Sequence, residues 1–265
     1  MSDRVESFRR LHQSGPPLIL ANAWDAGSAR LIESLGAKAI ATTSAGVDWT
    51  LGYPDGNVLP VSRLAELAKA ITRVVKVPLS VDFEAGYSDD PAQAAENLKP
   101  ILDAGAVGIN IEDGGDPPSL LAAKIERIKR AGAVFVNART DVYLRGLAAE
   151  EKRVEETLER ARIYREAGAD GLFVPALIAR EQIEAVTAGA ELPVNLLAWG
   201  GLAPVKDLAA WGVRRLSAGS GIAQVLWGQA ATLAKDFLEH GRSETIAGGA
   251  LSYADIQKLF AAGSA

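Results

Sequence analysis

The sequence predicts an α/β fold of the (β/α)8 TIM-barrel class, with an extra helix at the C-terminal end. The main observation is a pattern that occurs eight times: a short apolar run, a polar or acidic residue where a strand would end, and a helix-length amphipathic segment. The runs are residues 17–24, 37–44, 78–84, 106–113, 133–141, 169–175, 193–199 and 214–220. The length of 265 residues also suits one barrel, which typically needs about 250 residues.

The segments between these runs support the same fold. Runs such as 107–111 are mostly non-alternating, as expected for parallel strands covered on both faces. Segments 92–104 and 154–167 carry apolar residues at three- and four-residue spacing, which predicts amphipathic helices. Glycine follows the expected helix ends at Leu35-Gly36, Ala104-Gly105, Ala131-Gly132, Ala167-Gly168 and Trp211-Gly212. An open doubly wound sheet shares these features, but eight evenly spaced units favour the closed barrel.

The C-terminal part adds an element that the basic barrel lacks. We expect a barrel domain over residues 1–240, ending in a long helix at about 222–240, and a connector and helical arm over 241–265. Within the arm, 241–249 is polar and carries glycine, and 253–262 places Tyr253, Ile256, Leu259 and Phe260 at helical spacing. This small apolar face either docks on its own barrel or crosses to a second subunit, giving a homodimer or homotetramer.

Composition limits the class of partner. A formal net charge of -5 argues against nucleic acid or an anionic membrane surface, so small molecules are the expected partners. The absence of cysteine excludes disulfides, thiolate metal sites and a cysteine nucleophile. Residues 1–12 are charged and lack an apolar signal core, which predicts a cytoplasmic protein. His12 and His240 lie outside strand ends, and we interpret both as surface helix residues without a catalytic role.

Acidic residues at strand ends are the strongest chemical signal. Asp82 and Glu84 close the third run, and strand alternation would point both carboxylates to the same side. Glu112 and Asp113 close the fourth run. Such a group of acids in a shielded mouth requires a cation, and oxygen-only ligands suit Mg²⁺, with Mn²⁺ as an alternative. Helix capping or pairing with arginine would also explain a single acid of this kind.

Other polar residues surround the same expected mouth. Arg139 ends the fifth run, where its guanidinium can bind a substrate carboxylate bidentately or neutralise the acids. After the second run, Thr43, Ser44, Ala45 and Gly46 form a loop of small residues whose N–H groups and hydroxyls can hold an anionic oxygen. Asp55, in the same long loop, is either a turn residue or an acid of the site.

Taken together, these motifs resemble the isocitrate lyase/phosphoenolpyruvate mutase superfamily. The resemblance covers about residues 5–240 and rests on Asn22-Ala23-Trp24-Asp25, Thr43-Ser44-Ala45-Gly46, Gly52-Tyr53-Pro54-Asp55-Gly56, Asp82-Phe83-Glu84-Ala85-Gly86-Tyr87, Ile111-Glu112-Asp113 and Asn137-Ala138-Arg139-Thr140-Asp141. It implies a (β/α)8 barrel that binds Mg²⁺ and a 2-oxo or 2-hydroxy carboxylate, and a C-terminal helix exchanged between subunits. By position, Asp82 resembles the direct metal ligand, and Glu84 and Glu112 resemble the water-mediated ligands.

The same resemblance assigns the remaining site residues. Arg139 resembles the carboxylate-binding arginine, residues 44–46 resemble the anion-binding loop, and Asp55 resembles a further site acid. The candidate substrate-binding residues are therefore Thr43, Ser44, Ala45, Gly46, Asp82 and Arg139, and the candidate catalytic residues are Ser44, Asp55 and Arg139.

Two departures from the superfamily pattern restrict the activity. Its isocitrate and methylisocitrate lyases carry a catalytic cysteine on a mobile loop after the fourth strand, whereas this chain has only residues 114–118 there and no cysteine. Thr42 stands where those lyases have tyrosine and the phosphonate mutases have tryptophan, and the mutases' asparagine-bearing loop is also missing. Neither activity is supported directly.

Chemistry then selects among the remaining reactions. Decarboxylation of a 2-oxo diacid through a metal-stabilised enolate needs no general base, whereas retro-aldol cleavage needs one, with Asp55 or Tyr53 as candidates. The sequence therefore predicts a Mg²⁺-dependent lyase that cleaves C–C bonds of, or decarboxylates, a small 2-oxo or 2-hydroxy (di)carboxylate. A phosphonomutase-type isomerase and a 2-oxo acid binding protein with little or no turnover are the alternatives.

Overall fold

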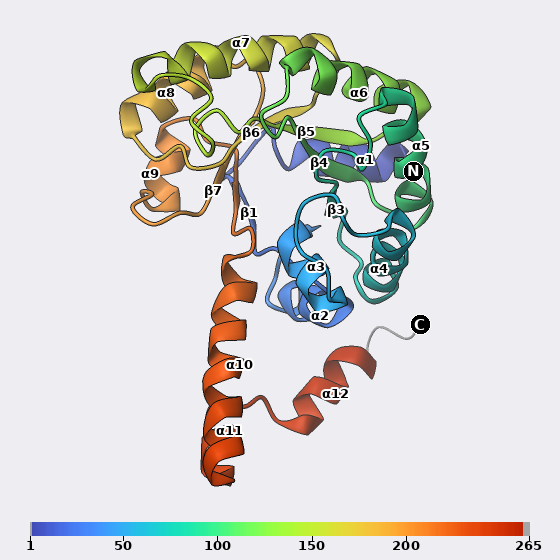
Figure 1. Cartoon of the computed structure of the whole chain (residues 1–265), viewed down its shortest axis with the longest axis vertical. Coiled ribbons are helices and arrows are strands. Elements are labelled where there is room, and N and C mark those ends of the chain that lie inside the picture. The colour runs from blue at the N-terminus through green and yellow to red at the C-terminus, as the bar shows by residue number, and fades with distance from the viewer. Residues whose placement is uncertain (1, 262–265) are drawn as a thin grey trace.

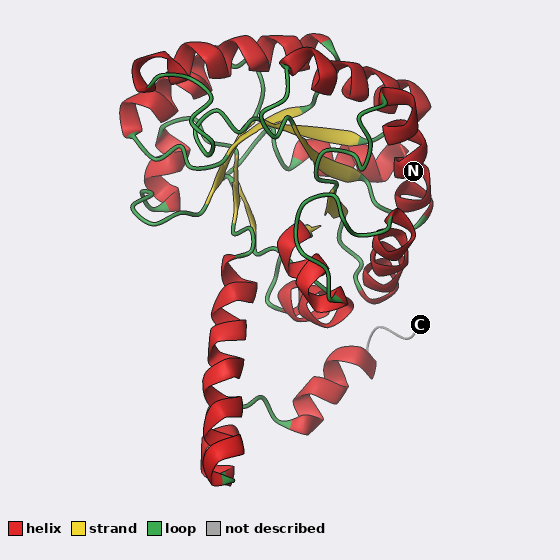
Figure 2. Ribbon diagram, in the orientation of Figure 1, coloured by secondary structure: helices red, strands yellow, loops and turns green. Residues whose placement is uncertain are grey.

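Eight parallel strands form a barrel surrounded by helices in the computed structural model, which describes residues 2–261 (Figures 1 and 2). The strands are β1 (Leu18–Leu20), β2 (Ile40–Ala41), β3 (Leu79–Asp82), β4 (Gly108–Glu112), β5 (Phe135–Arg139), β6 (Gly171–Val174), β7 (Val194–Leu197) and β8 (Arg215–Ser217). Each strand lies inside one predicted run. The sheet runs in the order β1-β8-β7-β6-β5-β4-β3-β2, and a parallel bridge between Ala23 and Thr42 joins its two edges. The predicted barrel is confirmed.

The helices alternate with the strands, as the periodicity predicts. They are α1 (Ser2–Arg10), α2 (Ala26–Ser34), α3 (Ser44–Leu51), α4 (Val61–Val74), α5 (Pro91–Asp103), α6 (Pro118–Ala131), the 3-10 helix η1 (Glu150–Lys152), α7 (Arg153–Glu166), α8 (Arg180–Gly189), α9 (Val205–Ala210), α10 (Gly221–His240), α11 (Ser243–Ala247) and α12 (Tyr253–Ala261). Gly105, after α5, has a φ of 99° and so uses the left-handed freedom of glycine, whereas Gly132, after α6, is extended at 176°. Within residues 2–261, no helix has the length and apolar composition needed to cross a membrane.

Aromatic rings close the barrel floor. Phe8 of α1 meets Phe135 of β5 edge-on at 5.2 Å between ring centroids, and His12 stacks on Phe135 at 4.3 Å. Gly108 makes room for this packing, because a Cβ there would lie 2.8 Å from the Phe8 ring. Burial, reinforced by the positive charge of Arg215, lowers the pKa of His12 to about 3. The prediction that His12 is a surface residue is therefore wrong, although His240 is exposed as predicted.

Above the floor, the barrel interior is polar. Arg215 is fully buried and donates from Nη2 to Asn110 Oδ1 at 3.1 Å and from Nε to Ser217 Oγ at 3.2 Å. Asn137 Nδ2 donates to the same Asn110 oxygen at 2.9 Å. Burial lowers the pKa of Arg215 to about 9. These side chains form the layer on which the functional mouth rests.

One side of the barrel wall lacks a covering helix. In Figure 1, α10 extends away from the barrel, and the large side chains Val225, Trp227 and Leu238 along it are exposed. Ile19 of β1 is 54% exposed and lines an apolar groove of about 740 Å³ with Ile32 and other residues. The groove lies outside the barrel and contains none of the predicted site residues.

The C-terminal arm returns toward its own barrel. The predicted connector, 241–249, contains the short helix α11, and the predicted helix 253–262 appears as α12, with Ala262 outside the described residues. α12 contacts α2, where Arg30 Nε donates to the carbonyl of Leu259 at 2.7 Å. Docking on the chain's own barrel was one of the two expected arrangements. Exchange of the arm between subunits and the division at residue 240 stay predictions.

Candidate active site

A cavity of about 260 Å³ opens at the carboxyl ends of the strands, where barrels of this class place their chemistry. Its lining includes these predicted site residues: Thr43, Ser44, Ala45, Asp55, Asp82 and Arg139. Gly46 instead packs against the wall, since a Cβ there would come within 2.8 Å of the Thr43 methyl and 2.9 Å of Trp24 Cβ. Strand ends that are far apart in sequence thus meet around one small space.

Asp82 is the last residue of β3 and is anchored by the end of β2. Its backbone N–H donates to the Thr42 hydroxyl at 2.8 Å, and its Oδ2 accepts from the backbone N–H of Ser44 at 3.3 Å. Ser44 begins α3, so the positive end of that helix faces the carboxylate. Burial raises the pKa of Asp82 above its ordinary value. A bound cation would offset this charge.

Glu84 reaches the mouth in a different way from the predicted one. β3 ends at Asp82, and Glu84 has a φ of 47°, so strand alternation does not set its direction. The Tyr87 hydroxyl donates to Glu84 Oε1 at 2.6 Å, and the backbone N–H of Asn57 donates to Oε2. These bonds turn the buried Glu84 carboxylate toward α3. Burial raises its pKa.

Glu112 and Arg139 form an ion pair at the ends of β4 and β5, next to the residues that follow β3. The β4–β5 register places the two residues side by side, and Arg139 Nη1 lies 2.7 Å from Glu112 Oε2. Arg139 also donates two hydrogen bonds to Asp141, from Nε to Oδ1 at 2.7 Å and from Nη2 to Oδ2 at 3.1 Å. Burial raises the pKa of Glu112 to about 7, and Arg139 opposes that shift. Arg139 therefore neutralises acids, as one of its two predicted roles required.

Asp113 does not share the mouth with the other strand-end acids. Its Oδ2 accepts from Tyr164 Oη at 2.7 Å and lies 2.8 Å from Arg160 Nη1, while its Oδ1 accepts from the backbone N–H of Asp141 at 3.0 Å. It is 2% exposed. Asp113 thus fixes α7 and the end of β5, and the expectation that it belongs to the acid cluster is not met.

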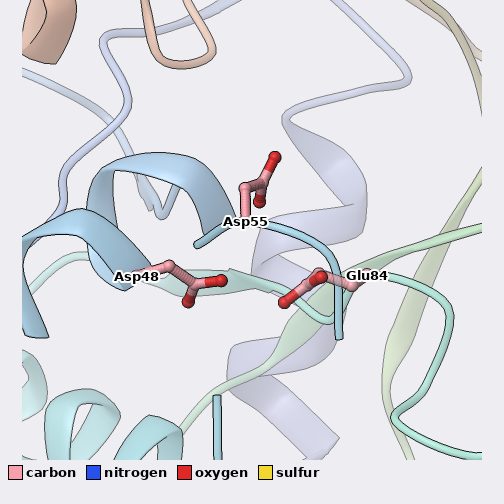
Figure 3. A group of neighbouring side chains, drawn as sticks. All are labelled: Asp48, Asp55 and Glu84. Carbon is pink, nitrogen blue, oxygen red and sulfur yellow. The ribbon is translucent and has the colours of Figure 1, made fainter. Parts of the chain in front are cut away.

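Three carboxylates converge beside the cavity, those of Asp48, Asp55 and Glu84, with one oxygen of each within 4.8 Å of the others (Figure 3). This is the group of metal-competent side chains found among residues 2–261. Its donors are all carboxylate oxygens, which suit a hard divalent cation. Asp82 and Glu112, also predicted as ligands, are not members of this group.

Sequence reasoning missed several residues of the site. Asp48 lies one helical turn after Ser44 on α3, which was read as part of a loop. Asn22 accepts from Gly219 N at 2.9 Å and donates to the Thr42 carbonyl at 2.7 Å, joining the loops after three strands at the cavity wall. Asn110 and Ser217 also line the cavity, and for Asn110 the available signal was a single polar residue inside an otherwise apolar run.

The family model for phosphoenolpyruvate phosphomutase matches residues 8–238. The chain belongs to this family. The predicted resemblance to the isocitrate lyase/phosphoenolpyruvate mutase superfamily is confirmed, and its members are lyases or mutases.

The matches to related proteins cover most of this chain. An uncharacterized protein of Mycobacterium tuberculosis (strain ATCC 25618 / H37Rv) is 41% identical over 219 residues, covering 81% of this chain and 82% of the relative. An oxaloacetate decarboxylase of Bradyrhizobium sp. (strain ORS 278) is 30% identical over 203 residues, covering 73% of this chain and 70% of its own. A crystal structure of a Burkholderia cenocepacia J2315 protein, provisionally named a phosphonomutase, has a TM-score of 0.83 and 39% identity, covering 88% of this chain and 99% of that chain.

Proposed function

We propose that the chain is a Mg²⁺-dependent carbon–carbon lyase that acts on a small 2-oxo or 2-hydroxy dicarboxylate. The observation that carries this proposal is the presence of Asp82 and Arg139 on the wall of one polar cavity of about 260 Å³. Drug-sized ligands typically occupy about 300–1,000 Å³, so this volume suits an acid of few carbons. Both lyases and mutases occur in the superfamily, and the chain's own residues favour the lyase.

The donor set fits a magnesium ion, or Mn²⁺ in its place. Asp82 would hold the ion directly, with Glu84 and Glu112 acting through bound water. When bound, the ion would supply Lewis-acid polarisation of a 2-oxo oxygen and positive charge in a mouth where acids outnumber arginines. An anionic substrate would otherwise meet the carboxylates of Asp82 and Asp55 on the cavity wall.

The chain's own groups would orient the substrate. Arg139 engages Asp141 through Nε and Nη2, and Glu112 through Nη1. A guanidinium has five N–H donors, so two remain for a substrate carboxylate. At the opposite wall, the first turn of α3 presents Thr43, Ser44 and Ala45. Free N–H groups at a helix start favour an anionic oxygen.

Of the two cleavage reactions considered, decarboxylation requires fewer catalytic groups in this site. Loss of CO₂ from a 2-oxo acid with a carboxylate on C3 breaks one C–C bond and leaves its electron pair as an enolate, without a general base. Retro-aldol cleavage of a 2-hydroxy acid would need a base on the hydroxyl, and the exposed Asp55 on the cavity wall is the candidate. The 30% identity to an oxaloacetate decarboxylase supports the first of these reactions.

The segment after β4 supports a reaction without a gating cysteine. Only residues 113–117 separate β4 from α6, and the chain contains no cysteine. A proton donor on a long mobile loop, as the resemblance describes for isocitrate lyases, therefore has no counterpart. We therefore propose that water or a residue of the cavity wall protonates the product.

A panel assay tests the proposal. The full chain is incubated with Mg²⁺ and a series of 2-oxo and 2-hydroxy diacids, and pyruvate, glyoxylate and CO₂ are measured, with EDTA as the matched control. We expect EDTA-sensitive release of one of these products. Rearrangement of a phosphonate instead would favour the isomerase, and tight diacid binding without turnover would favour a binding protein.

A further inference from the structure

Arg215 is a buried cation without an acidic partner. It is 0% exposed on β8, two residues before Ser217 of the cavity wall, and within residues 2–261 it forms no ion pair with a carboxylate. Burial lowers the pKa of Arg215, and the negative charge of Asp82 opposes that shift. An unpaired buried charge is unfavourable for folding, so a functional role is the natural explanation for this arginine.

The hydrogen bonds of Arg215 lead to Asn110. Arg215 Nη2 donates to Asn110 Oδ1 at 3.1 Å, and Asn137 Nδ2 donates to the same oxygen at 2.9 Å. The β4–β5 register sets Asn110 beside Asn137. Gly171 of β6 leaves space for the second amide, because a Cβ there would lie 2.8 Å from Asn137 Oδ1. Two donors thus hold the oxygen of the Asn110 amide in place.

The arginine decides which way the Asn110 amide faces. Two asparagines can form an amide–amide hydrogen bond in either sense, because each side chain carries both a donor and an acceptor. A guanidinium only donates, so the Asn110 atom that meets Arg215 has to be the oxygen. The Asn110 nitrogen therefore takes the opposite position, and no acceptor in the described part of the chain receives a hydrogen bond from it.

This amide nitrogen belongs to the cavity wall. Asn110 is buried, lines the cavity of about 260 Å³ and lies beside Asp82 in the β3–β4 register. A fixed N–H donor next to the reacting atoms stabilises negative charge that develops on an oxygen, and it does so without reorienting during the reaction. Arg215 adds its positive charge from behind the same amide.

We propose that Asn110 is a catalytic residue and that Arg215 is its positioning residue, an inference that rests on the proposed lyase function. When a 2-oxo acid loses CO₂, the electron pair of the broken C–C bond forms the enolate C=C bond, and the carbonyl π pair moves onto the 2-oxo oxygen. The Asn110 N–H donates a hydrogen bond to that oxygen without giving up its proton. Arg215 keeps the N–H directed at the cavity.

Oxalate tests the donor, because this planar dianion imitates the enolate of a 2-oxo acid. Its affinity is measured by calorimetry with Mg²⁺ for the full chain, Arg215→Met, Arg215→Lys and the control Ser80→Ala. Ser80 is buried on β3, and its hydroxyl has no hydrogen-bond partner within residues 2–261. We expect Arg215→Met to bind oxalate about 10-fold more weakly, the equivalent of one hydrogen bond, and the control to match the parent. Arg215→Lys, whose ammonium also only donates, should bind within about threefold of the parent.

A melting curve separates positioning from a structural role. Methionine leaves the hydrogen-bond partners of Arg215 paired, because Asn110 Oδ1 keeps its bond from Asn137. Ser217 Oγ keeps its bond to Asn195 Oδ1. Since the change also removes an unpaired buried charge, Arg215→Met should melt at or above the temperature of the parent while it loses oxalate affinity.

Asn110→Asp is the second variant, used if Arg215→Met fails to fold. Aspartate keeps the oxygen that Arg215 holds and puts an oxygen in place of the N–H, so oxalate affinity should fall by at least about 10-fold. On a diacid that the panel assay identifies, Arg215→Met should lower kcat and leave KM within about threefold, because the N–H bonds the enolate oxygen more strongly than the neutral carbonyl.

The outcomes separate this inference from the proposed function. Parental oxalate affinity in Arg215→Met and Asn110→Asp overturns the inference, as does a lysine variant as weak as the methionine variant or a parent that binds no oxalate. If Arg215→Met weakens oxalate binding while the panel finds no turnover, the orientation of Asn110 by Arg215 stands and the lyase fails. Turnover with parental kcat in both variants keeps the lyase and overturns the inference.

Discussion

The two sides of the barrel mouth carry similar acids but balance their charge differently. On one side, Glu112 and Asp141 surround Arg139, which lies within 2.7 Å of both. On the other side, the side chains of Asp48 and Glu84 point toward one another (Figure 3), and within residues 2–261 neither forms an ion pair with a lysine or arginine. The difference comes from register, because β4 and β5 place Glu112 beside Arg139, whereas α3 and its following loop place Asp48 and Asp55 near Glu84.

This comparison teaches that an acid's type and position do not fix its role. Glu112 ends β4 and Glu84 lies two residues after β3, yet Glu112 pairs with Arg139 whereas Glu84 accepts a hydrogen bond from the Tyr87 hydroxyl. The overall charge of -5 gives no hint of this separation. The following experiments test this difference between the acids, beginning with the largest expected effect.

Asp82→Ala removes the carboxylate between the two sides. We expect Mg²⁺ affinity at the Asp82 site to fall by more than about 100-fold, beyond the loss typical of indirect ligands, and Mg²⁺-dependent activity to disappear. The fold should survive, because strand-end residues at this face serve function more than packing. Calorimetry with Mg²⁺ and a melting curve measure both effects, and an unchanged Mg²⁺ affinity would exclude Asp82 as the direct ligand.

Arg139→Lys tests the arginine side. Lysine keeps the charge but loses the planar fork, so binding of a 2-oxo diacid should weaken by roughly 10- to 100-fold, the equivalent of one charged hydrogen bond. Arg145→Lys is the matched control, since Arg145 pairs with the same Asp141 but is not among the residues that line the cavity. Equal diacid binding by Arg139→Lys and the parent would exclude a bidentate contact.

Glu84→Gln and Glu112→Gln compare the two sides directly. Each should weaken Mg²⁺ binding at the Asp82 site by about 10- to 100-fold, as expected for ligands that act through water. Their effects on the metal-free protein should differ in size. Burial raises the pKa of both carboxyls, so both amides should raise the melting temperature, but Glu112→Gln should raise it less because it also weakens the pairing with Arg139. Equal shifts would show that Arg139 does not distinguish the two acids.

The pH dependence of stability sharpens the comparison further. The pKa of Asp48 and of Glu112 is raised to about 7, in both cases first by burial. A carboxyl with a raised pKa stabilises the folded state fully below its unfolded pKa of about 4 and loses that contribution as pH rises through about 7. In EDTA, the free energy of unfolding should therefore fall between pH 5 and pH 8, and less steeply in Asp48→Asn. Urea unfolding curves that show no such fall would contradict these pKa values.

Truncation after Arg242 should have the smallest effect on the mouth. It removes α11 and α12 and with them the bond from Arg30 to Leu259, while every acid of the mouth stays in place. We expect an unchanged Mg²⁺ affinity, a smaller oligomer and a lower melting temperature. Light scattering that finds the same oligomer would leave α12 as a local cap rather than an exchanged element.

Much of the fold was accessible from the sequence because strand periodicity and glycine punctuation are local signals. All eight strands lie within the predicted runs, and the long helix expected at 222–240 is α10, Gly221–His240. The placement of Asp82 and Arg139 at one mouth followed from the barrel alone, since parallel strands bring their carboxyl ends to one face.

The misses depended on conformations and long-range contacts that a sequence pattern does not reveal. Asp48 was overlooked because the small residues before it were read as a loop, whereas α3 begins at Ser44. Glu84 turns away from strand alternation through a positive φ. His12 looked like a surface residue because Phe135, on which it stacks, lies far along the chain.

The packed rings of Phe8, His12 and Phe135 fill the barrel floor. Their burial closes the floor of the barrel, so the cavity at the carboxyl ends of the strands opens on one face of the barrel. If the proposed reaction takes place there, product and substrate use the same opening, and product release must precede the binding of the next substrate.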